Sequence, residues 1–472
     1  LLCFDSDTAG TRFTENLAKT LFNNRINFRT ADIPSPFKDI SEYYASGGDL
    51  SHIVNNSTNG IVGLCAKLTD RNEFKTFAYT AARYVGKPEL AELFNAATPN
   101  FSEHPDWFKE LRKSCFQPPS EDIIAQEVIK KHQLLYKCNV GFYEYYRGAW
   151  RFRPDEVIQS YIADELGHYR TGSRVTAILK LVKADTFTEA EFNKKPLFNF
   201  INGTLELDTL NFREHRPDDM SSIQVTYPYV PGAYSEQWEQ FIETIACHDD
   251  KRICLLQEIA GYILFPDNSL QKMFYLIGDG ANGKSVYLNV LSHLFGRENV
   301  SNVPLSGITQ DFQRIHFINS LFNVSTEIKP EIAGAEEYLK QISAGDTVSA
   351  CFKGKDYVTF QSRSKLFFAC NEQIRARDVS YGFLRRLCII KFAAKFIDYP
   401  KKPNEYPRDV DIEKKLLNDL PAIFNWALNG YRLMMNVKSF TETDDLVESI
   451  QDFEEISNPI VVFYQENPVT EK

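Results

Sequence analysis

The residues best suited to chemistry lie at 278–285, which read GDGANGKS. The glycines allow backbone N–H groups to turn inward around phosphate oxygens, and a helix that begins there adds positive potential. In that arrangement Lys284 reaches the β- and γ-phosphates, and Ser285 ligates Mg²⁺. An apolar strand expected at 273–277 and a helix expected after the motif distinguish it from an ordinary glycine-rich turn. We therefore predict a site for ATP and Mg²⁺, with the binding residues Gly278, Asp279, Gly280, Ala281, Asn282, Gly283, Lys284 and Ser285.

Two further apolar segments end in polar side chains that such a site needs. The segment SLFNVSTEI places Glu327 at the tip of an expected strand, where a carboxylate polarises water and holds the metal. In the segment SKLFFACNE the expected strand ends in Asn371, whose amide can sense the γ-phosphate or orient the attacking water. Each signal is weak alone, because any strand can end in Glu and Asn is common in turns. Together with the phosphate loop, they predict Lys284, Glu327 and Asn371 as catalytic residues.

Two groups of cations accompany the same stretch. Arg385 and Arg386 precede an apolar segment in GFLRRLCIIKF, and an arginine from a neighbouring subunit commonly completes such a site. Lys353 and Lys355 lie at the turn of an expected strand–turn–strand, where they suit the phosphates of single-stranded nucleic acid. The alternatives are a solvated pair of arginines and a pair of lysines that maintains solubility.

The elements that must position these groups follow from the pattern of apolar residues. Strands and helices alternate over 272–397, which is typical of a parallel sheet, so we predict an α/β fold. An aromatic-rich hairpin pattern follows residue 131, and an Asn202-Gly203 turn joins two expected strands. The predicted segments are 1–50 (α/β), 51–130 (helical), 131–262 (α+β), 263–397 (the parallel-sheet domain) and 398–472 (helical).

Composition sets broad limits on the class of protein. The 472 residues are 43% hydrophobic and 25% charged, and no apolar run approaches the ~18 residues that span a bilayer. Nine cysteines without a CxxC pair favour reduced thiols inside a cell over a disulfide framework or a zinc site. The net charge of −10 restricts nucleic-acid binding to a local positive group. The chain begins at Leu1 without a signal-peptide pattern, so we expect a fragment of a longer intracellular protein.

The order of these motifs resembles that of superfamily 3 helicases, and in particular of the primase-helicases of phages, plasmids and poxviruses. The resemblance covers about residues 131–397. Thr326 stands where an acid often precedes the glutamate, and Ile374 where a proline often follows the asparagine. The first departure leaves Mg²⁺ binding more dependent on Ser285 and water. The segments that carry the resemblance are GDGANGKS, STE, LKQISAGDTVSACFKGKDY, FFACNE and FLRRL, with FNFINGTLELDTLNFREHRPDD and LLQEIAGYILF upstream.

This resemblance implies an AAA+-like ATPase that assembles as a hexameric ring and moves 3′ to 5′ on single-stranded DNA. It implies that Lys284 and Ser285 bind nucleotide and metal, that Glu327 activates water and that Asn371 is the sensor. A replication protein of this kind would act in the host cytoplasm, with a polymerase or an initiator as a partner. The implied DNA contacts are Lys340, Lys353 and Lys355, and the arginine that acts on a neighbour's site is Arg385 or Arg386.

The first residues suggest what precedes the motor. The segment LLCFDSDTAG places Asp5 and Asp7 at the end of an expected strand, where two carboxylates suit Mg²⁺. With DIPSPFKDISEYY it resembles the second acidic motif of a Toprim domain, the catalytic fold of bacterial-type primases. The family's glutamate motif and zinc module would precede Leu1. Residues 1–50 are therefore expected to be the C-terminal part of such a domain, which would not prime by itself.

Two other functions are compatible with the same motifs. A phosphate-loop ATPase can remodel protein or package DNA without unwinding it, and an origin-binding scaffold can recruit a polymerase without being an enzyme. Stimulation of hydrolysis by DNA that depends on Lys353 and Lys355 would favour the helicase. A scaffold would keep its partner function after Lys284→Ala.

Overall fold

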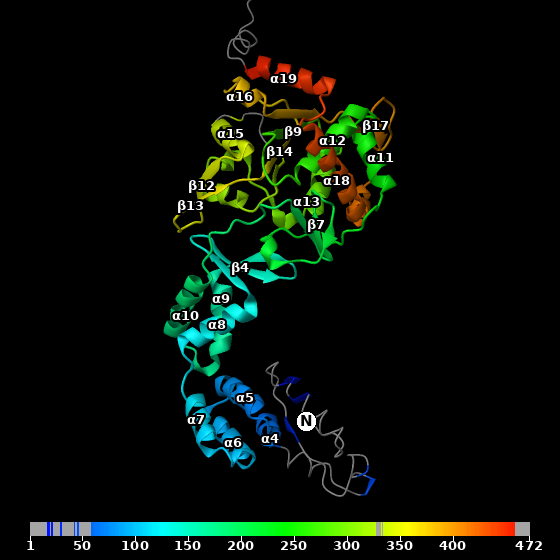
Figure 1. Cartoon of the computed structure of the whole chain (residues 1–472). Helices are drawn as coiled ribbons and strands as arrows, with labels where there is room; N and C mark the ends of the chain where they lie inside the picture. Colours follow the sequence, from blue (N-terminus) through cyan, green and yellow to red (C-terminus); the bar gives the residue numbers. More distant parts are fainter. Residues whose placement is uncertain are drawn as a thin grey trace, which may run out of the picture. The chain divides into compact units, whose positions relative to one another are not determined.

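The structure, a computed structural model, describes residues 58–326, 332 and 334–457, and a few residues before 58, namely 17, 18, 20, 21, 29, 30, 42, 45 and 46. The chain forms two compact units, which can be followed by sequence colour in Figure 1. One consists of residues 1–133 and 154–186, and the other of residues 134–153 and 187–472. Residues of the predicted segment 131–262 thus occur in both units, and the bounds of the five predicted segments stay predictions.

The described part of the first unit is mainly helical, as the sequence predicts for 51–130. Asp70 and Ser120 cap two of its helices by accepting hydrogen bonds from the backbone N–H groups of Glu73 and Ile123. Phe74 is fully buried in a core that the helices share. The elements are β1 (Arg29–Thr30), β2 (Thr58–Asn59), α4 (Gly60–Lys67), α5 (Arg71–Tyr84), α6 (Lys87–Ala97), η1 (Thr98–Phe101), α7 (Pro105–Cys115), α8 (Glu121–His132), α9 (Asp155–Leu166), η2 (Gly167–Tyr169) and α10 (Gly172–Asp185).

Two small antiparallel sheets open the second unit. In the first, β3 (Leu134–Lys137) pairs with β4 (Gly141–Tyr146), which pairs with β5 (Ala149–Arg153). In the second, β6 (Leu197–Phe200) pairs with β7 (Gly203–Glu206), and β8 (Phe212–Arg213) completes the sheet. The two hairpins predicted after residue 131 and at the Asn202-Gly203 turn are therefore confirmed.

A five-stranded parallel sheet forms the centre of the second unit and confirms the α/β prediction for 272–397. Its strand order is β10-β11-β14-β9-β15. The strand before the phosphate loop, β9, lies between β14 and β15, so β14 separates it from β11. The strands are β9 (Met273–Ile277), β10 (Val300–Ser301), β11 (Phe322–Ser325), β14 (Lys365–Cys370) and β15 (Leu387–Lys391).

Helices cover both faces of this sheet because successive strand residues point to opposite sides (Figure 1). Phe274 and Leu276 of β9 pack in one core with α12 (Asp250–Tyr262), α13 (Lys284–Leu294) and α18 (Leu420–Val437). Met273 and Tyr275 pack in the other core with α15 (Glu336–Ala344), α16 (Tyr381–Leu384) and α19 (Asp444–Ser457). Since all five residues of β9 are buried, the phosphate loop begins from a rigid strand.

The remaining elements surround this three-layered core. An antiparallel hairpin of β12 (Thr347–Cys351) and β13 (Tyr357–Gln361) follows α15, as the sequence predicts. Two short strands, β16 (Lys395–Ile397) and β17 (Glu405–Pro407), pair after β15. The other helices are α11 (Glu236–Ile245), α14 (Asp311–Arg314) and α17 (Ile412–Leu416), with the 3-10 turns η3 (Pro217–Asp219), η4 (Arg297–Asn299), η5 (Leu305–Gly307), η6 (Ile315–Phe317) and η7 (Leu417–Asp419).

Two expectations about the class of protein can be compared with the described residues. Within them, no helix combines the length and apolar character needed to cross a bilayer. The described cysteines are free thiols, as expected, although Cys138 is exposed rather than packed. Burial raises the pKa of the Cys115 thiol to about 12.

Candidate functional site

The loop at 278–285 leaves the carboxyl end of β9 and leads directly into α13. Gly283 is the residue before the helix and has φ +87°, a region that favours glycine. A Cβ atom on Gly283 would lie 2.5 Å from Ile245 Cγ2, so a larger residue would displace the loop. The loop thus turns at Gly283 and ends at the N-terminus of α13, where the helix potential favours an anion.

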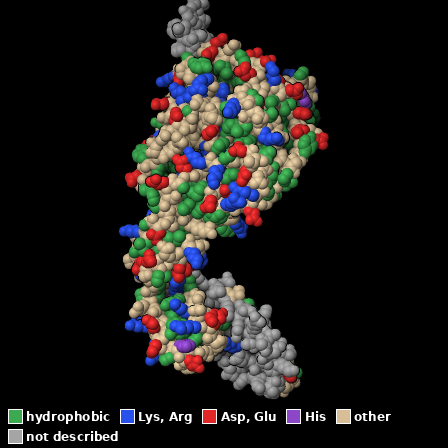
Figure 2. All heavy atoms as spheres, viewed as in Figure 1, with side chains coloured by type: hydrophobic (Ala, Val, Ile, Leu, Met, Phe, Trp, Pro, Cys, Tyr) green, Lys and Arg blue, Asp and Glu red, His purple; other side chains and the backbone are tan. Residues whose placement is uncertain are grey.

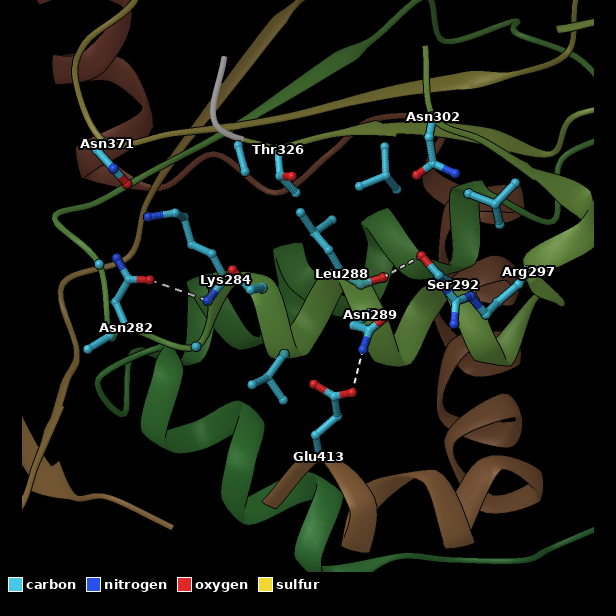
Figure 3. A pocket seen from close by; sticks show the side chains of 18 residues that line it. Asn282, Lys284, Leu288, Asn289, Ser292, Arg297, Asn302, Thr326, Asn371 and Glu413 are labelled. Atoms are coloured by element: carbon cyan, nitrogen blue, oxygen red, sulfur yellow. Dashed lines mark hydrogen bonds between the residues drawn. The ribbon is translucent and has the colours of Figure 1, made fainter. Parts of the chain in front are cut away.

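Lys284 is the cation of this loop, and 5% of its surface is exposed. Its ammonium group donates a hydrogen bond to the Gly278 carbonyl, and its backbone N–H donates to Asn282 Oδ1 at 3.4 Å (Figure 3). Burial lowers the pKa of the Lys284 ammonium, and the nearby Cys370 and Asp279 oppose that effect. The side chain is thus a partly desolvated cation whose interaction with a phosphate would be strong.

A cavity of about 570 Å³ opens beside the loop and is lined by six of the eight predicted nucleotide-binding residues, 280–285, but not by Gly278 or Asp279. Lys284, Ser285 and Asn371 all line it, and so does Thr326 at the end of β11. In Figure 3 the Lys284 side chain extends toward Asn371, with Thr326 on the same side of the cavity. This agreement arises because β9, β11 and β14 are parallel, so the groups that follow them meet at one edge of the sheet.

Three predicted site residues lie outside the described residues. Glu327 is the residue after Thr326, and Asp5 and Asp7 lie near the start of the chain. Their assigned roles in water activation and metal binding stay predictions. Of the two departures from the helicase pattern, Thr326 lines the cavity and Ile374 is fully buried in the core beside α15.

Several lining residues were not found by sequence reasoning. Arg297 and Asn302 lie at the end of the cavity away from Lys284, beside Ser292 (Figure 3). Glu413 of α17 reaches the cavity from the C-terminal part of the chain and accepts a hydrogen bond from Asn289 Nδ2. No local pattern marks these residues: Arg297 and Asn302 follow α13 in the chain, and Glu413 is brought to the cavity by the packing of α17.

The donor set of this cavity fits a nucleotide triphosphate with Mg²⁺. Lys284, the loop N–H groups and the Asn371 amide offer positive charge and hydrogen-bond donors to phosphate oxygens. The hydroxyl groups of Ser285 and Thr326 are oxygen ligands of the kind that Mg²⁺ accepts beside water and phosphate. Among the described residues, no group of three or more His, Cys, Asp or Glu side chains is arranged to hold a metal ion. Of the described residues, the hydroxyl groups would then hold a metal here, together with the nucleotide.

Arg385 and Arg386 lie at the opposite end of the sheet from the phosphate loop. The parallel register pairs Leu387 with Met273 and Lys391 with Ile277, so the arginines precede the end where β9 begins. Five strand residues separate the two ends by about 13 Å. Arg385 is exposed and donates to Gln271 Oε1 at 2.5 Å. Arg386 is half-buried and donates to the Gly382 carbonyl; burial and the nearby Arg385 lower its pKa.

Lys353 and Lys355 are exposed at the tip of the β12–β13 hairpin. The hairpin is held by α14: Arg314 Nε donates to the Ser349 carbonyl at 3.2 Å, and the Tyr357 hydroxyl donates to Asp311 Oδ2 at 2.5 Å. Arg314 is 4% exposed, so its bond to β12 is shielded from water. The two lysines are therefore presented on a supported element.

Lys340 lies on α15 and not on the hairpin that carries Lys353 and Lys355. Its ammonium group forms an ion pair with Asp378 Oδ2 at 2.8 Å. Burial would raise the pKa of Asp378, but hydrogen bonds from Lys340 and Ser380 outweigh it and lower the pKa to about 2. The DNA contact assigned to Lys340 stays a prediction, and the structure gives the residue an intramolecular partner.

Basic and acidic side chains are interspersed on the visible face of the second unit (Figure 2). This distribution agrees with the net charge of −10. An anionic polymer would thus need a local cationic element such as the hairpin tip.

Two protein families match separate parts of the chain. Residues 121–247 match the family described as D5 N terminal like. Residues 276–386 match a family of unknown function (DUF5906). The second match includes the phosphate loop, Thr326, the hairpin, Asn371 and the two arginines.

Two viral proteins are similar to the chain over long stretches. Putative helicase L207/L206 of Acanthamoeba polyphaga mimivirus is 22% identical over 382 residues, covering 65% of this chain and 38% of the relative. Putative helicase 184R of Invertebrate iridescent virus 6 is 24% identical over 296 residues, covering 54% and 29%. The chain thus spans well under half the length of these relatives. The apo A form of the NrS-1 C-terminal region has a similar fold, with a TM-score of 0.51, 11% identity, and coverage of 75% of this chain and 81% of that one.

Proposed function

We propose that this chain is an ATP-driven DNA helicase motor, part of a replicative primase-helicase of the superfamily 3 type. The observation that carries the proposal is the cavity at the carboxyl edge of the parallel sheet, where Lys284 extends toward Asn371 beside Thr326. Such an arrangement places a cation, a hydroxyl ligand and a polar sensor around one triphosphate. The names of the two viral relatives, both putative helicases, support the same class.

The residues of the cavity have distinct roles in the proposed reaction. Lys284 and the loop N–H groups bind the β- and γ-phosphates and offset the charge that develops on them. Ser285 provides a hydroxyl ligand for Mg²⁺, and Asn371 orients the water or the γ-phosphate. Glu327 polarises the attacking water. Bound Mg²⁺ would neutralise phosphate charge during transfer.

A neighbouring subunit completes this proposed site. Arg385 and Arg386 lie about 13 Å or more from the loop of their own subunit, measured along β9 and β15. An arginine on that end of the sheet can reach a phosphate on another subunit, and a closed ring repeats the contact at every interface. We therefore propose a homo-oligomer, a hexamer in the implied architecture. Arg385 is the more accessible of the two side chains.

The proposed nucleic-acid partner is single-stranded DNA, bound by Lys353 and Lys355 in the ring channel. Two exposed ammonium groups on a braced hairpin suit a phosphate backbone without sequence preference. Lys340 is a further proposed contact. The complete protein would act inside an infected host cell together with a polymerase or an initiator. Asp5 and Asp7 would belong to the Mg²⁺ site of its Toprim primase domain.

Strand separation on tailed duplexes tests this proposal directly. The chain is expected to hydrolyse ATP and to release the strand of a 3′-tailed duplex but not of a 5′-tailed one. Lys284→Ala should reduce hydrolysis by about 10²- to 10³-fold, because a donor to the transferred phosphate is lost. Lys251→Ala, which removes an exposed lysine of α12, is the matched control and should retain both activities.

The outcomes separate the candidate functions. ATP hydrolysis without strand separation on either tail would contradict the helicase and favour a remodelling or packaging ATPase. Release of the 5′-tailed strand alone would contradict the proposed polarity. Retained hydrolysis in Lys284→Ala would contradict the assigned site itself.

A further inference from the structure

A second cavity, of about 530 Å³, adjoins the phosphate loop. It lies between α11, the start of α13, the β16–β17 pair and α17, all of which belong to the second unit. The two cavities share Ala281, Gly283, Val286 and Glu413. A molecule whose charged end occupies the first cavity can therefore continue into the second.

Two aromatic rings form one wall of this second cavity. The Phe396 backbone N–H donates to the Ala281 carbonyl at 2.7 Å, which fixes β16 against the phosphate loop. The Phe396 ring also lies close to the loop, because a Cβ built on Gly283 would lie 3.4 Å from Phe396 Cε2. Tyr406 lies beside it, with ring centroids 6.0 Å apart. Both side chains are half-buried, so part of each ring surface is available to a ligand.

Apolar side chains from two helices also line the cavity, and one carboxylate lies where the two cavities meet. Phe241 of α11 and Val286 of α13 supply the apolar surface. Glu413, where the two cavities meet, accepts a hydrogen bond from Asn289 through Oε1, which leaves further acceptor capacity on the carboxylate. The cavity is also lined by Gln240, Thr244, Arg408 and Asp409, but most of its accessible surface is apolar, which suits a planar heteroaromatic ring better than a phosphate. A hydroxyl-bearing sugar would connect the two at Glu413.

We propose that this cavity binds the purine base of the nucleotide whose phosphates occupy the loop at 278–285. Phe396 and Tyr406 form the surface against which the base stacks, and Glu413 accepts a hydrogen bond from the ribose. Because the two ring planes are tilted by 39°, a base that stacks on one ring contacts the other at an angle, and the two fused rings of a purine reach both side chains better than a pyrimidine does. This inference rests on the proposed ATP-dependent function and adds the residues that recognise the base.

Calorimetric titration of the full chain in Mg²⁺ tests the inference with ATP and inorganic tripolyphosphate as probes. The unchanged chain should bind ATP at least about tenfold more tightly than tripolyphosphate, because stacking and the ribose contact are added. It should also bind GTP more tightly than CTP. Tyr406→Ala should weaken ATP binding about tenfold and leave tripolyphosphate binding unchanged.

Two further variants provide the controls. Tyr399→Ala removes an aromatic side chain that is 82% exposed in the connection between β16 and β17, and it should bind both probes as the unchanged chain does. Thr244→Trp fills the cavity from α11 without altering the aromatic wall. It should reproduce the selective loss of ATP affinity if Tyr406→Ala does not fold.

Equal affinity of the unchanged chain for ATP and tripolyphosphate would overturn the base subsite. So would an equal loss of both probes in the correctly folded Tyr406→Ala and Thr244→Trp variants, or no loss of either. A chain that binds neither probe would overturn the proposed function itself. Tripolyphosphate binding thus separates failure of the base subsite from failure of the phosphate site.

Discussion

Lys340 and Asp378 form an ion pair that stabilises the fold only while the Asp378 carboxyl group is ionised. The pKa of Asp378 is lowered to about 2, below the value of about 3.9 for an unfolded chain. A lowered folded-state pKa means that the pair stabilises the fold above about pH 4 and that this contribution is lost as the pH falls toward 2. With 37% and 24% of the two side chains exposed, solvent screening keeps the contribution small.

A double-mutant cycle of Lys340→Met and Asp378→Asn should therefore give a coupling free energy of about 0.5 kcal/mol at pH 7. The coupling, measured by urea unfolding, should decrease between about pH 4 and pH 2. The matched control is the more exposed pair Lys194–Glu191, for which a smaller coupling is expected. A coupling that grows as the pH falls would contradict the assigned ion pair.

At the scale of single residues, the sequence predicts the site residues that lie close to a recognisable strand. It does not predict those that tertiary packing brings to the cavity. Lys284, Ser285 and Asn371 each follow a strand that is recognisable from its apolar run, and all three line one cavity. Arg297 follows α13 and Glu413 lies far from the loop in sequence; both line the same cavity, but neither belongs to a pattern that indicates phosphate or ribose binding. Tertiary contacts between distant elements have no local signature.

At the scale of elements, α14 supports both strands of the DNA-binding hairpin proposed here. Arg314 holds β12 through the Ser349 carbonyl, and Asp311 accepts the hydroxyl hydrogen of Tyr357 in β13. That hydrogen bond lowers the pKa of Asp311, and the nearby Arg314 adds to the effect. On its other side, the hairpin packs through Phe352 against the aromatic cluster of the β3–β5 sheet. The position of the lysines at the tip thus depends on these supports.

Tyr357→Phe should loosen the hairpin without changing the nucleotide cavity. The concentration of single-stranded DNA that half-maximally stimulates hydrolysis should rise about threefold, because one hydrogen bond to a carboxylate is lost. Basal hydrolysis should stay constant. Tyr381→Phe alters a tyrosine that is 81% exposed on α16 and serves as the control. An unchanged DNA requirement would contradict a supporting role for α14.

Elements with a regular pattern of apolar residues can be predicted from the sequence. The alternation of strands and helices over 272–397 and the hairpin after α15 appear as expected, since apolar periodicity reports burial directly. The strand order did not follow from the sequence, because β14 inserts between β9 and β11 through long-range pairing. The short β16–β17 pair is not predictable in this way, because the Lys and Pro residues of 398–409 leave no apolar alternation there.

At the scale of the whole molecule, the phosphate loop and the two arginines occupy opposite ends of one sheet. In the proposed homo-oligomer, the arginines of one subunit would face the phosphate loop of the next, as in a head-to-tail ring. The net charge of −10 is compatible with this assembly if DNA contacts are confined to the hairpin tips. Neither the proposed ring nor its proposed binding of DNA follows from composition, because both depend on where a few cations lie in space.

The most direct test of the central claim is the rate of ATP hydrolysis with and without single-stranded DNA. DNA should raise the rate of the unchanged chain and of the control Lys401→Ala/Lys402→Ala, which removes two exposed lysines from the β16–β17 connection. In Lys353→Ala/Lys355→Ala, DNA stimulation should be abolished while basal hydrolysis is retained. Full stimulation in that double variant would contradict the account of the hairpin as the DNA-contacting part of an ATP-driven motor.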